Sequence, residues 1–318
     1  MTRPNAFALT IVAATICAAP VAMAQQAGAL ASTGTVTFDA ELESEALSWT
    51  PLYSVYLPPA YEENDRAYPV IYLMPGGAGQ THRDWFLKGG AAETFDRLIG
   101  SGEVPPFIAI SPDPRRTPQP EFNTYYLNDA DGEVRYEDMF VQDLIPHVEE
   151  TYRVLAEEEY RGIIGLSMGG FAALAYSMKY PDMFTAAAAL SPAIRTDPQM
   201  LAMNQAGWDR RYGMIWGEGL EGEARLNEKY RADSVFAMIE DADAETLGAT
   251  EYFIDVGSDD VFFEGSVLLH NMLRSEGSTE RTFASDHRFM VREGGHVWSY
   301  WREGLPEAVR FVTGVMQN

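Results

Sequence analysis

One short segment, GLSMGG at residues 165–170, constrains the fold of this chain more than any other. An apolar run over 161–166 leads directly into it, and a helix-prone stretch over 169–180 leads directly out. The turn between strand and helix must be tight, so small residues have to flank Ser167, and glycine stands two positions before it and two after it. This context predicts a nucleophile elbow, a turn that lifts the serine oxygen above a sheet. The alternative is a glycine-rich packing turn with a capping serine.

Other short apolar runs extend the same pattern along the chain. They suit strands that are buried on both faces of a mostly parallel sheet, and helical stretches lie between them. The predicted strands cover residues 52–57, 68–74, 107–111, 161–166, 184–190 and 251–256, with a strand-like run at 282–291, and the predicted helices cover 137–152, 169–180, 262–276 and 304–315. This alternation predicts an α/β fold with a mostly parallel central sheet and helices on both faces. Residues 195–248 interrupt it, and we expect them to form an insertion over one end of the sheet.

The N-terminal residues have the features of a secretory signal peptide. Arg3 supplies a positive start, residues 6–19 are almost wholly apolar, and Ala22-Met23-Ala24 forms a small-x-small cleavage pattern. We therefore expect residues 1–24 to be removed after Ala24, which leaves residues 25–318 as a single domain that is periplasmic or secreted. The alternative is an uncleaved N-terminal anchor, for which the apolar run is short.

The composition disfavours several classes of partner and site. With 23 Lys and Arg against 47 Asp and Glu, the formal net charge is −24, which repels nucleic-acid phosphates and anionic lipid headgroups. We therefore expect no nucleic-acid partner and, once the signal peptide is removed, no membrane association. The single cysteine, Cys17, excludes an internal disulfide framework and a multi-cysteine metal site.

An acidic loop invites comparison with a calcium-binding loop. Asp129, Asp131, Gly132 and Asp138 stand at loop-like offsets, but Leu127 occupies the first ligand position. We therefore interpret the loop as a solvated acidic turn, and we expect no metal and no cofactor.

Residues downstream of Ser167 complete a candidate catalytic set. A serine becomes a good nucleophile when a base takes its proton and a third group holds the base, and in folds with this elbow the chain order is serine, acid, histidine. The acid is expected just after the strand at 251–256, where Asp259 and Asp260 compete. Of the five histidines, His296 lies in a glycine-rich loop between the last predicted strand and the final helix. A base on such a loop can reach the elbow, so His296 is the predicted base.

Two backbone N–H groups are candidates for stabilising negative charge on a substrate oxygen. The N–H of Met168 lies at the start of the helix after the elbow, where it can donate to an oxyanion. The strand at 68–74 ends in Pro75-Gly76-Gly77-Ala78-Gly79, whose glycines let the backbone approach a substrate closely. We predict the N–H of Gly77 as the second donor, and an ordinary glycine-rich turn is the alternative.

The expected insertion is rich in aromatic residues. Trp208, Tyr212, Trp216 and Tyr230 lie within it. The first three are candidate substrate contacts, because aromatic side chains beside a cleft can line an aryl or sugar site. The alternative, which we favour, is that these side chains form a small satellite core.

Together these segments resemble the esterase D-type branch of the α/β-hydrolases, which holds feruloyl and acetylxylan esterases, S-formylglutathione hydrolases, enterochelin-type siderophore esterases and mycolyltransferases. The resemblance runs from about residue 45 to the C-terminus. In the family pattern the acid is the third residue after the strand-end glycine, which is Asp260 here. Family members commonly have His-Gly where this chain has Pro75-Gly76, which puts the shape of that loop in question. The motifs that carry the resemblance are VYLPP at 55–59, YLMPGG at 72–77, YED at 136–138, GLSMGG at 165–170, GSDDVF at 257–262 and GGHVW at 294–298.

The resemblance implies an α/β-hydrolase fold and a serine carboxylic-ester hydrolase that uses Ser167, His296 and Asp260 as a catalytic triad. The expected substrates are feruloyl or acetyl esters of polysaccharide, or related small esters, because export argues against the cytosolic substrate of S-formylglutathione hydrolases. A siderophore esterase and an acyltransferase with the same triad are alternatives. A non-catalytic binding protein on the same fold is the alternative from another class.

Overall fold

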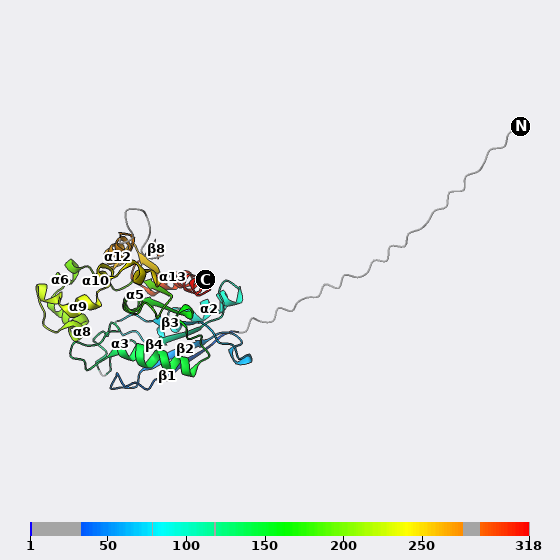
Figure 1. Cartoon of the computed structure of the whole chain (residues 1–318), viewed down its shortest axis with the longest axis horizontal. Helices are drawn as coiled ribbons and strands as arrows, with labels where there is room; N and C mark the ends of the chain where they lie inside the picture. The colour runs from blue at the N-terminus through cyan, green and yellow to red at the C-terminus, as the bar shows by residue number, and fades with distance from the viewer. Residues whose placement is uncertain (2–32, 78, 118, 276–286, 318) are drawn as a thin grey trace. The chain divides into compact units, whose positions relative to one another are not determined.

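The computed structural model of the chain describes residues 1, 33–77, 79–117, 119–275 and 287–317 (Figure 1). The predicted cleavage site after Ala24, with nearly all of the predicted signal peptide, lies outside the described residues. Ser32–Asn318 form one compact unit, and its described strands make one eight-stranded sheet. The strands are β1 (Thr35–Glu41), β2 (Leu52–Leu57), β3 (Val70–Met74), β4 (Ile108–Pro112), β5 (Arg161–Leu166), β6 (Ala186–Leu190), β7 (Glu251–Gly257) and β8 (His287–Arg292).

The sheet is mostly parallel, as predicted. Its strand order is β1-β2-β4-β3-β5-β6-β7-β8, and β1 to β2 and β2 to β4 are its antiparallel pairs. The register pairs Met74 of β3 with Gly165 of β5, and Gly257 of β7 with Arg292 of β8. The carboxyl ends of these parallel strands therefore lie at one edge of the sheet, where the loops that follow them converge.

The central strands are buried on both faces, which explains their unbroken apolar sequences. Successive side chains of β3 alternate between two hydrophobic cores: Val70, Tyr72 and Met74 belong to one, and Ile71 and Leu73 belong to the other. All five are fully buried. A strand of this kind requires a layer of helices on each face of the sheet.

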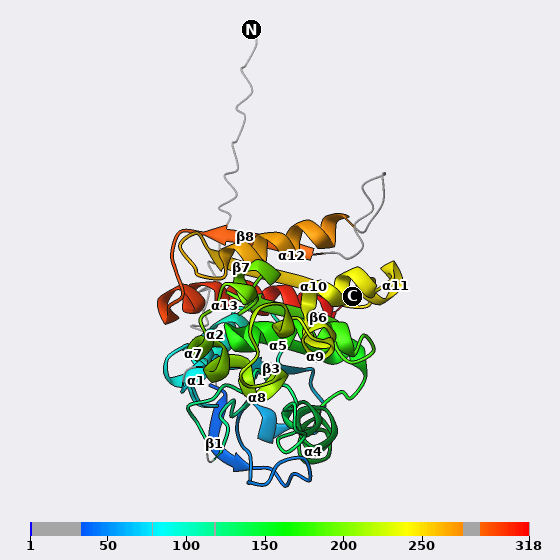
Figure 2. The ribbon, with the colours of Figure 1, turned by 90° about the vertical axis from the view of Figure 1, so that its left-hand side faces the viewer.

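Helices supply both layers, as predicted. The core on one face packs against α2 and α13, which lie side by side, and the core on the other packs against α4, α5 and α12 (Figures 1 and 2). No helix in the described part of the chain is long and apolar enough to cross a membrane. The α-helices outside the insertion are α1 (Asp84–Leu87), α2 (Ala91–Gly100), α3 (Tyr136–Asp138), α4 (Ile145–Thr151), α5 (Met168–Lys179), α12 (Phe263–Ser275) and α13 (Trp298–Val315).

The predicted elements differ most from the observed ones in four places, and residues 282–286 of the strand-like run predicted at 282–291 lie outside the described residues. The edge strand β1 was not predicted, although Val36, Phe38 and Ala40 alternate with polar residues as a half-buried strand requires. The short helices α1 and α2 were not predicted either. A π-helical turn, η2 (Met139–Leu144), joins α3 to α4 within the stretch predicted as one helix. The final helix begins at Trp298, six residues earlier than predicted.

The insertion at 195–248 is confirmed as a set of short helices between β6 and β7. Figure 1 shows α6, α8, α9 and α10 gathered together. The elements are α6 (Asp197–Leu201), α7 (Gln205–Trp208), the π-helical turn η4 (Asp209–Gly213), α8 (Met214–Trp216), the 3-10 turn η5 (Gly222–Arg225), α9 (Glu228–Asp233), α10 (Val235–Asp241) and α11 (Ala244–Gly248). Further 3-10 turns are η1 (Tyr61–Glu63) and η3 (Glu158–Tyr160).

Candidate active site

Ser167 lies between the end of β5 and the start of α5, in the turn that the sequence predicts. Its backbone has φ 54° and ψ −118°, a strained conformation for a residue with a side chain. Neighbouring backbone packs too tightly for larger residues: a Cβ at Gly165 would lie 1.9 Å from the carbonyl oxygen of Gly169, and one at Gly169 would lie 2.0 Å from that of Met74. The flanking glycines are therefore a steric requirement of the turn.

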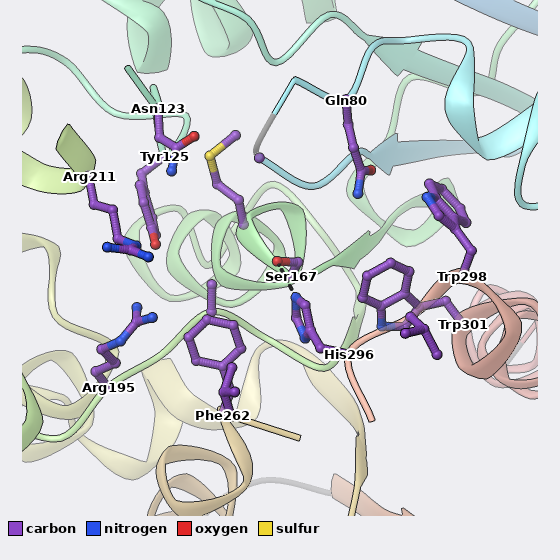
Figure 3. Close-up of a pocket in the computed structure, with 15 residues that line it drawn as sticks. Gln80, Asn123, Tyr125, Ser167, Arg195, Arg211, Phe262, His296, Trp298 and Trp301 are labelled. Atoms are coloured by element: carbon purple, nitrogen blue, oxygen red, sulfur yellow. Dashed lines mark hydrogen bonds between the residues drawn. The ribbon is translucent and has the colours of Figure 1, made fainter. Parts of the chain in front are cut away.

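His296 connects Ser167 to an acidic residue. Its Nε2 lies 2.8 Å from Ser167 Oγ, a contact drawn as a dashed line in Figure 3. Its Nδ1 lies 2.9 Å from Asp260 Oδ2 and 3.1 Å from Asp260 Oδ1. If Asp260 accepts the Nδ1 proton, Nε2 is left as an acceptor for the serine hydroxyl. The structure thus brings together the three predicted residues, which are 129 and 36 positions apart in sequence.

The surroundings of Asp260 favour its ionised form. Burial alone would raise the pKa of its carboxyl, but the hydrogen bonds and charge of His296, with the N–H of Phe262, outweigh burial and hold the pKa below its ordinary value. The Phe262 N–H donates to Asp260 Oδ1 at 2.9 Å, and the Asp260 side chain is fully buried. Asp259, the competing acid, is exposed.

The other histidines have partners elsewhere in the described structure. His82 is buried and its Nδ1 lies 2.7 Å from Ser54 Oγ. The Nε2 of His147 lies 3.0 Å from the hydroxyl of Tyr53. His270 and His287 contact each other at 2.8 Å, between Nδ1 of the first and Nε2 of the second. Their positions leave His296 as the histidine beside the elbow.

The two predicted oxyanion donors lie next to each other at the cavity. Gly77 and Met168 both line it, and a Cβ at Gly77 would lie 3.3 Å from the Met168 sulfur. Met168 is the first residue of α5, so its N–H has no partner within that helix. The loop before Gly77 is held at Pro75, which replaces the family's histidine, and at Gly76. The hydroxyl of Tyr126 donates to Pro75 O at 2.7 Å, and the N–H of Gly76 donates to Gln80 Oε1 at 2.9 Å.

A cavity of about 530 Å³ opens over Ser167. In Figure 3, Trp298 and Trp301 lie on one side of Ser167 and His296, and Arg195 and Arg211 lie on the other. These four residues line the cavity, together with Gln80, Asn123, Tyr125, Ala193, Val261, Phe262 and Val297. The volume and the mixed aromatic and polar wall suit a small organic ligand.

The three aromatic residues predicted as substrate contacts do not line this cavity, which corrects that prediction. Trp208, Tyr212 and Trp216 are buried, with exposed fractions of 0%, 1% and 5%. The rings of Tyr212 and Trp216 are stacked with centroids 4.7 Å apart, and Trp216 also meets Tyr230 edge-on at 5.0 Å. Burying aromatic surface in a satellite core, the favoured interpretation, explains their presence in the insertion.

Four cavity residues were missed as functional candidates. Trp298 stands two positions after His296 and Trp301 one helical turn later, so their closeness to the predicted base was a usable signal. Arg195 follows β6, and the loops at the carboxyl ends of parallel strands are where ligands bind in such sheets. For Arg211, inside the insertion, we find no sequence signal.

The acidic side chains that were compared with calcium ligands have other partners within the protein. Asp129 is buried in an ion pair with Arg116, and Asp138 pairs with Arg135 at 3.0 Å. Across the described ranges, no three histidine, cysteine or acidic side chains converge as metal ligands would.

Comparison with known proteins places this geometry in a family. The Esterase family model matches residues 44–312. Esterase Rv1288 of Mycobacterium tuberculosis is 31% identical over 217 residues, which are 62% of this chain and 44% of that protein. This chain therefore corresponds to less than half of the length of that relative. An acetyl esterase of Caldicellulosiruptor saccharolyticus is 25% identical over 256 residues, with 77% of this chain and 83% of that protein covered.

Solved structures agree with this placement. A ferulic acid esterase matches with a TM-score of 0.73 and 28% identity, over 89% of this chain and 99% of that one. An S-formylglutathione hydrolase from Agrobacterium tumefaciens shares the fold, with a TM-score of 0.66 and 18% identity over 89% of this chain and 96% of that one. The sheet order, the elbow and the family match lead to one conclusion: the chain belongs to the Esterase family, within the esterase D-type branch of the α/β-hydrolases.

Proposed function

We propose that this protein is a serine carboxylic-ester hydrolase with Ser167, His296 and Asp260 as its catalytic triad. The observation that carries the proposal is the continuous chain of hydrogen bonds from Asp260 through His296 to Ser167 Oγ at the floor of the cavity. A strained serine, a base at 2.8 Å and a buried acid behind the base form the arrangement that activates a hydroxyl for attack on a carbonyl.

The geometry supports a two-step acyl transfer to water. His296 Nε2 takes the proton of Ser167 as the serine oxygen attacks the ester carbonyl, and Asp260 stabilises the imidazolium that forms. The N–H groups of Gly77 and Met168 donate to the oxyanion; losing one such donor typically costs about 3–4 kcal/mol of barrier. His296 then protonates the departing alcohol, and water attacks the acyl-enzyme by the same route.

Substitution of the elbow serine tests this assignment. Ser167→Ala should abolish hydrolysis of 4-nitrophenyl acetate and labelling by a fluorophosphonate probe, because the attacking oxygen is gone. Circular dichroism and the melting temperature of the variant should stay close to wild type. Turnover at the wild-type level by a folded Ser167→Ala protein would refute the assignment.

We further propose an aryl acyl group, such as feruloyl, as the preferred acyl part of the substrate. The ring of Trp298, which lines the cavity beside Ser167 and meets the buried Trp301 edge-on, supports it, since aromatic rings stack on one another. The 28% identity to a ferulic acid esterase points the same way. Efficiency (kcat/KM) on methyl ferulate that equals or exceeds that on 4-nitrophenyl acetate would support it. Strong acetate turnover without ferulate turnover would favour acetylated glycans and short-chain esters.

We also propose that the protein is exported from the cytoplasm with a cleaved signal peptide. The apolar run and the Ala22-Met23-Ala24 pattern support cleavage after Ala24. Mass spectrometry of the protein recovered outside the cytoplasm should then show Gln25 as the first residue. A full-length chain that stays with the membrane fraction would indicate the uncleaved anchor instead.

A further inference from the structure

Two arginines face the same end of the cavity over Ser167. Arg195 follows β6, and Arg211 lies in the π-helical turn η4 of the insertion. Figure 3 shows the two side chains converging from either side on the space between Tyr125 and Phe262, away from the tryptophans. The cavity therefore has a cationic end and an aromatic end, with the serine between them.

The positive charge at this end is not neutralised by the described residues around it. Within the described ranges, neither guanidinium lies within ion-pair distance of a carboxylate. Arg195 Nη1 donates to the Tyr212 hydroxyl at 2.6 Å, and its guanidinium lies 4.5 Å from the Phe262 ring centroid. Burial, the largest cause, raises the pKa of Tyr212 well above its ordinary value, so the phenol accepts that hydrogen bond as a neutral group. Arg211 donates to Gly207 O across a long 3.4 Å contact.

An anion would complement this end of the cavity. Two like charges line one partly buried space, where they repel each other, and the described cavity wall contains no Asp or Glu to offset them. The chain as a whole has a net charge of −24, with about two acidic residues for each basic one, so this positively charged end of the cavity differs from the rest of the protein. A bound anion would relieve the repulsion and use the N–H donors that the protein leaves facing the cavity.

The insertion explains how Arg195 is held in place. Trp208 and Trp216 pack around Tyr212, with ring centroids 5.6 and 4.7 Å from it. Tyr212 in turn contacts the hydroxyl of Tyr125 at 3.1 Å and accepts from Arg195. The buried aromatic cluster thus holds Tyr212 in place, and Tyr212 positions the guanidinium of Arg195 at the cavity.

We propose that the ester hydrolysed at Ser167 carries a carboxylate that binds between Arg195 and Arg211. This inference rests on the proposed ester hydrolase function and names the class of substrate that the site takes. A guanidinium presents a planar fork of N–H donors that matches both oxygens of a carboxylate. The carboxylate can belong to the acyl part or to the alcohol part of the ester, and matched substrates separate the two.

Matched pairs of esters test the proposal on the mature chain. Monomethyl adipate against dimethyl adipate places the carboxylate in the acyl part. The pair 4-acetoxybenzoate and methyl 4-acetoxybenzoate places it in the alcohol part. The quantity compared is the ratio of kcat/KM for the anionic ester to that for its neutral partner, measured for wild type and variants, so that the intrinsic reactivity of each ester cancels.

We expect Arg211→Gln to lose the preference for the anionic ester over its neutral partner. A hydrogen bond to a charged group contributes enough that its removal should lower the ratio about 10- to 100-fold in one of the two pairs. Arg211→Lys, which keeps the charge, should restore part of it. Arg210→Gln is the matched control, because Arg210 is the adjacent arginine but is exposed and does not line the cavity; its ratio should equal that of wild type. Unchanged ratios in both pairs for a folded Arg211→Gln protein would overturn the inference.

A binding measurement separates this inference from the proposed function. The Ser167→Ala variant is titrated calorimetrically with monomethyl adipate, 4-acetoxybenzoate and their neutral partners, and so is Ser167→Ala/Arg211→Gln. Tighter binding of an anionic ester that Arg211→Gln abolishes supports the cationic end even if the wild type hydrolyses no ester, in which case the hydrolase proposal alone fails. If neutral esters are hydrolysed but neither kcat/KM nor binding favours the anionic esters, the carboxylate site is overturned and the hydrolase proposal stands.

Discussion

Replacing Asp260 with asparagine should disable His296 as a base, because the imidazole proton would move from Nδ1 to Nε2. Asp260 Oδ1 accepts the N–H of Phe262 at 2.9 Å, while Oδ2 lies 2.9 Å from His296 Nδ1. In Asp260→Asn the amide oxygen keeps the bond to Phe262, because the amide nitrogen cannot accept it. The NH₂ group then faces Nδ1 and donates to it. Nε2 must carry the remaining imidazole proton and no longer accepts one from Ser167.

The size of the effect follows from the same contact. A carboxylate 2.9 Å from the imidazole stabilises the imidazolium by about 6 kcal/mol when the effective dielectric constant is about 20. Losing that stabilisation in the transition state corresponds to a fall in kcat of roughly 10⁴-fold. The wrong tautomer acts in the same direction.

The assay is hydrolysis of 4-nitrophenyl acetate over a range of substrate concentrations. Asp259→Asn is the matched control, since Asp259 is the adjacent aspartate but is exposed. Its kcat should stay within about two-fold of wild type, as expected for an exposed substitution. A loss of less than about ten-fold in a folded Asp260→Asn protein, or an equal loss in Asp259→Asn, would refute the reasoning.

Further predictions concern the elbow, the sheet, the cavity wall and the response to acid. Gly165→Ala should destabilise the protein by about 3 kcal/mol or more and abolish activity, because the new Cβ would lie 1.9 Å from a backbone oxygen. Gly314→Ala, in α13 with no atom within 4 Å of the new Cβ, should leave urea-measured stability equal or raise it by up to about 1 kcal/mol. Asp255→Ala removes a buried carboxylate that pairs β7 with Arg292 of β8, and the unfolding free energy should fall by about 1–3 kcal/mol, because Arg292 is partly exposed and keeps Glu303 as a partner. Trp298→Ala should lower kcat/KM for methyl ferulate more than for 4-nitrophenyl acetate; an equal loss on both would argue against stacking on the acyl group. The pKa of Asp260 is lower in the native protein than its ordinary 3.8, so the ionised carboxylate stabilises the fold above about pH 3.8. That stability is lost as the pH falls through the native pKa, and the wild-type advantage over Asp260→Asn in urea unfolding should shrink there.

Local sequence determined the elements that depend on short-range rules. The buried strands are readable because a strand covered on both faces must be apolar throughout, and the elbow is readable because its turn excludes a Cβ on either side of Ser167. The chain order of serine, acid and histidine, with the glycine-rich loop around His296, named Ser167 and His296 and left Asp259 and Asp260 as competing acids. The resemblance to the family pattern then selected Asp260. The edge strand β1 escaped because one of its faces is open to solvent and its apolar positions are few.

Tertiary structure alone decided which side chains surround the reacting centre. An aromatic residue in a loop has the same sequence signature whether it lines a cavity or fills a core, so the packing of Trp208 and Trp216 away from Ser167 could not be read from the chain. Arg195 has a sequence signal in its place after β6, but Arg211 has none, and only the fold of the insertion brings both to the wall of one cavity. Backbone preference and burial are local properties that sequence records residue by residue. Which side chains line the cavity over Ser167 depends instead on long-range packing. The same packing leaves Arg195 and Arg211 at that cavity without a carboxylate partner among the described residues.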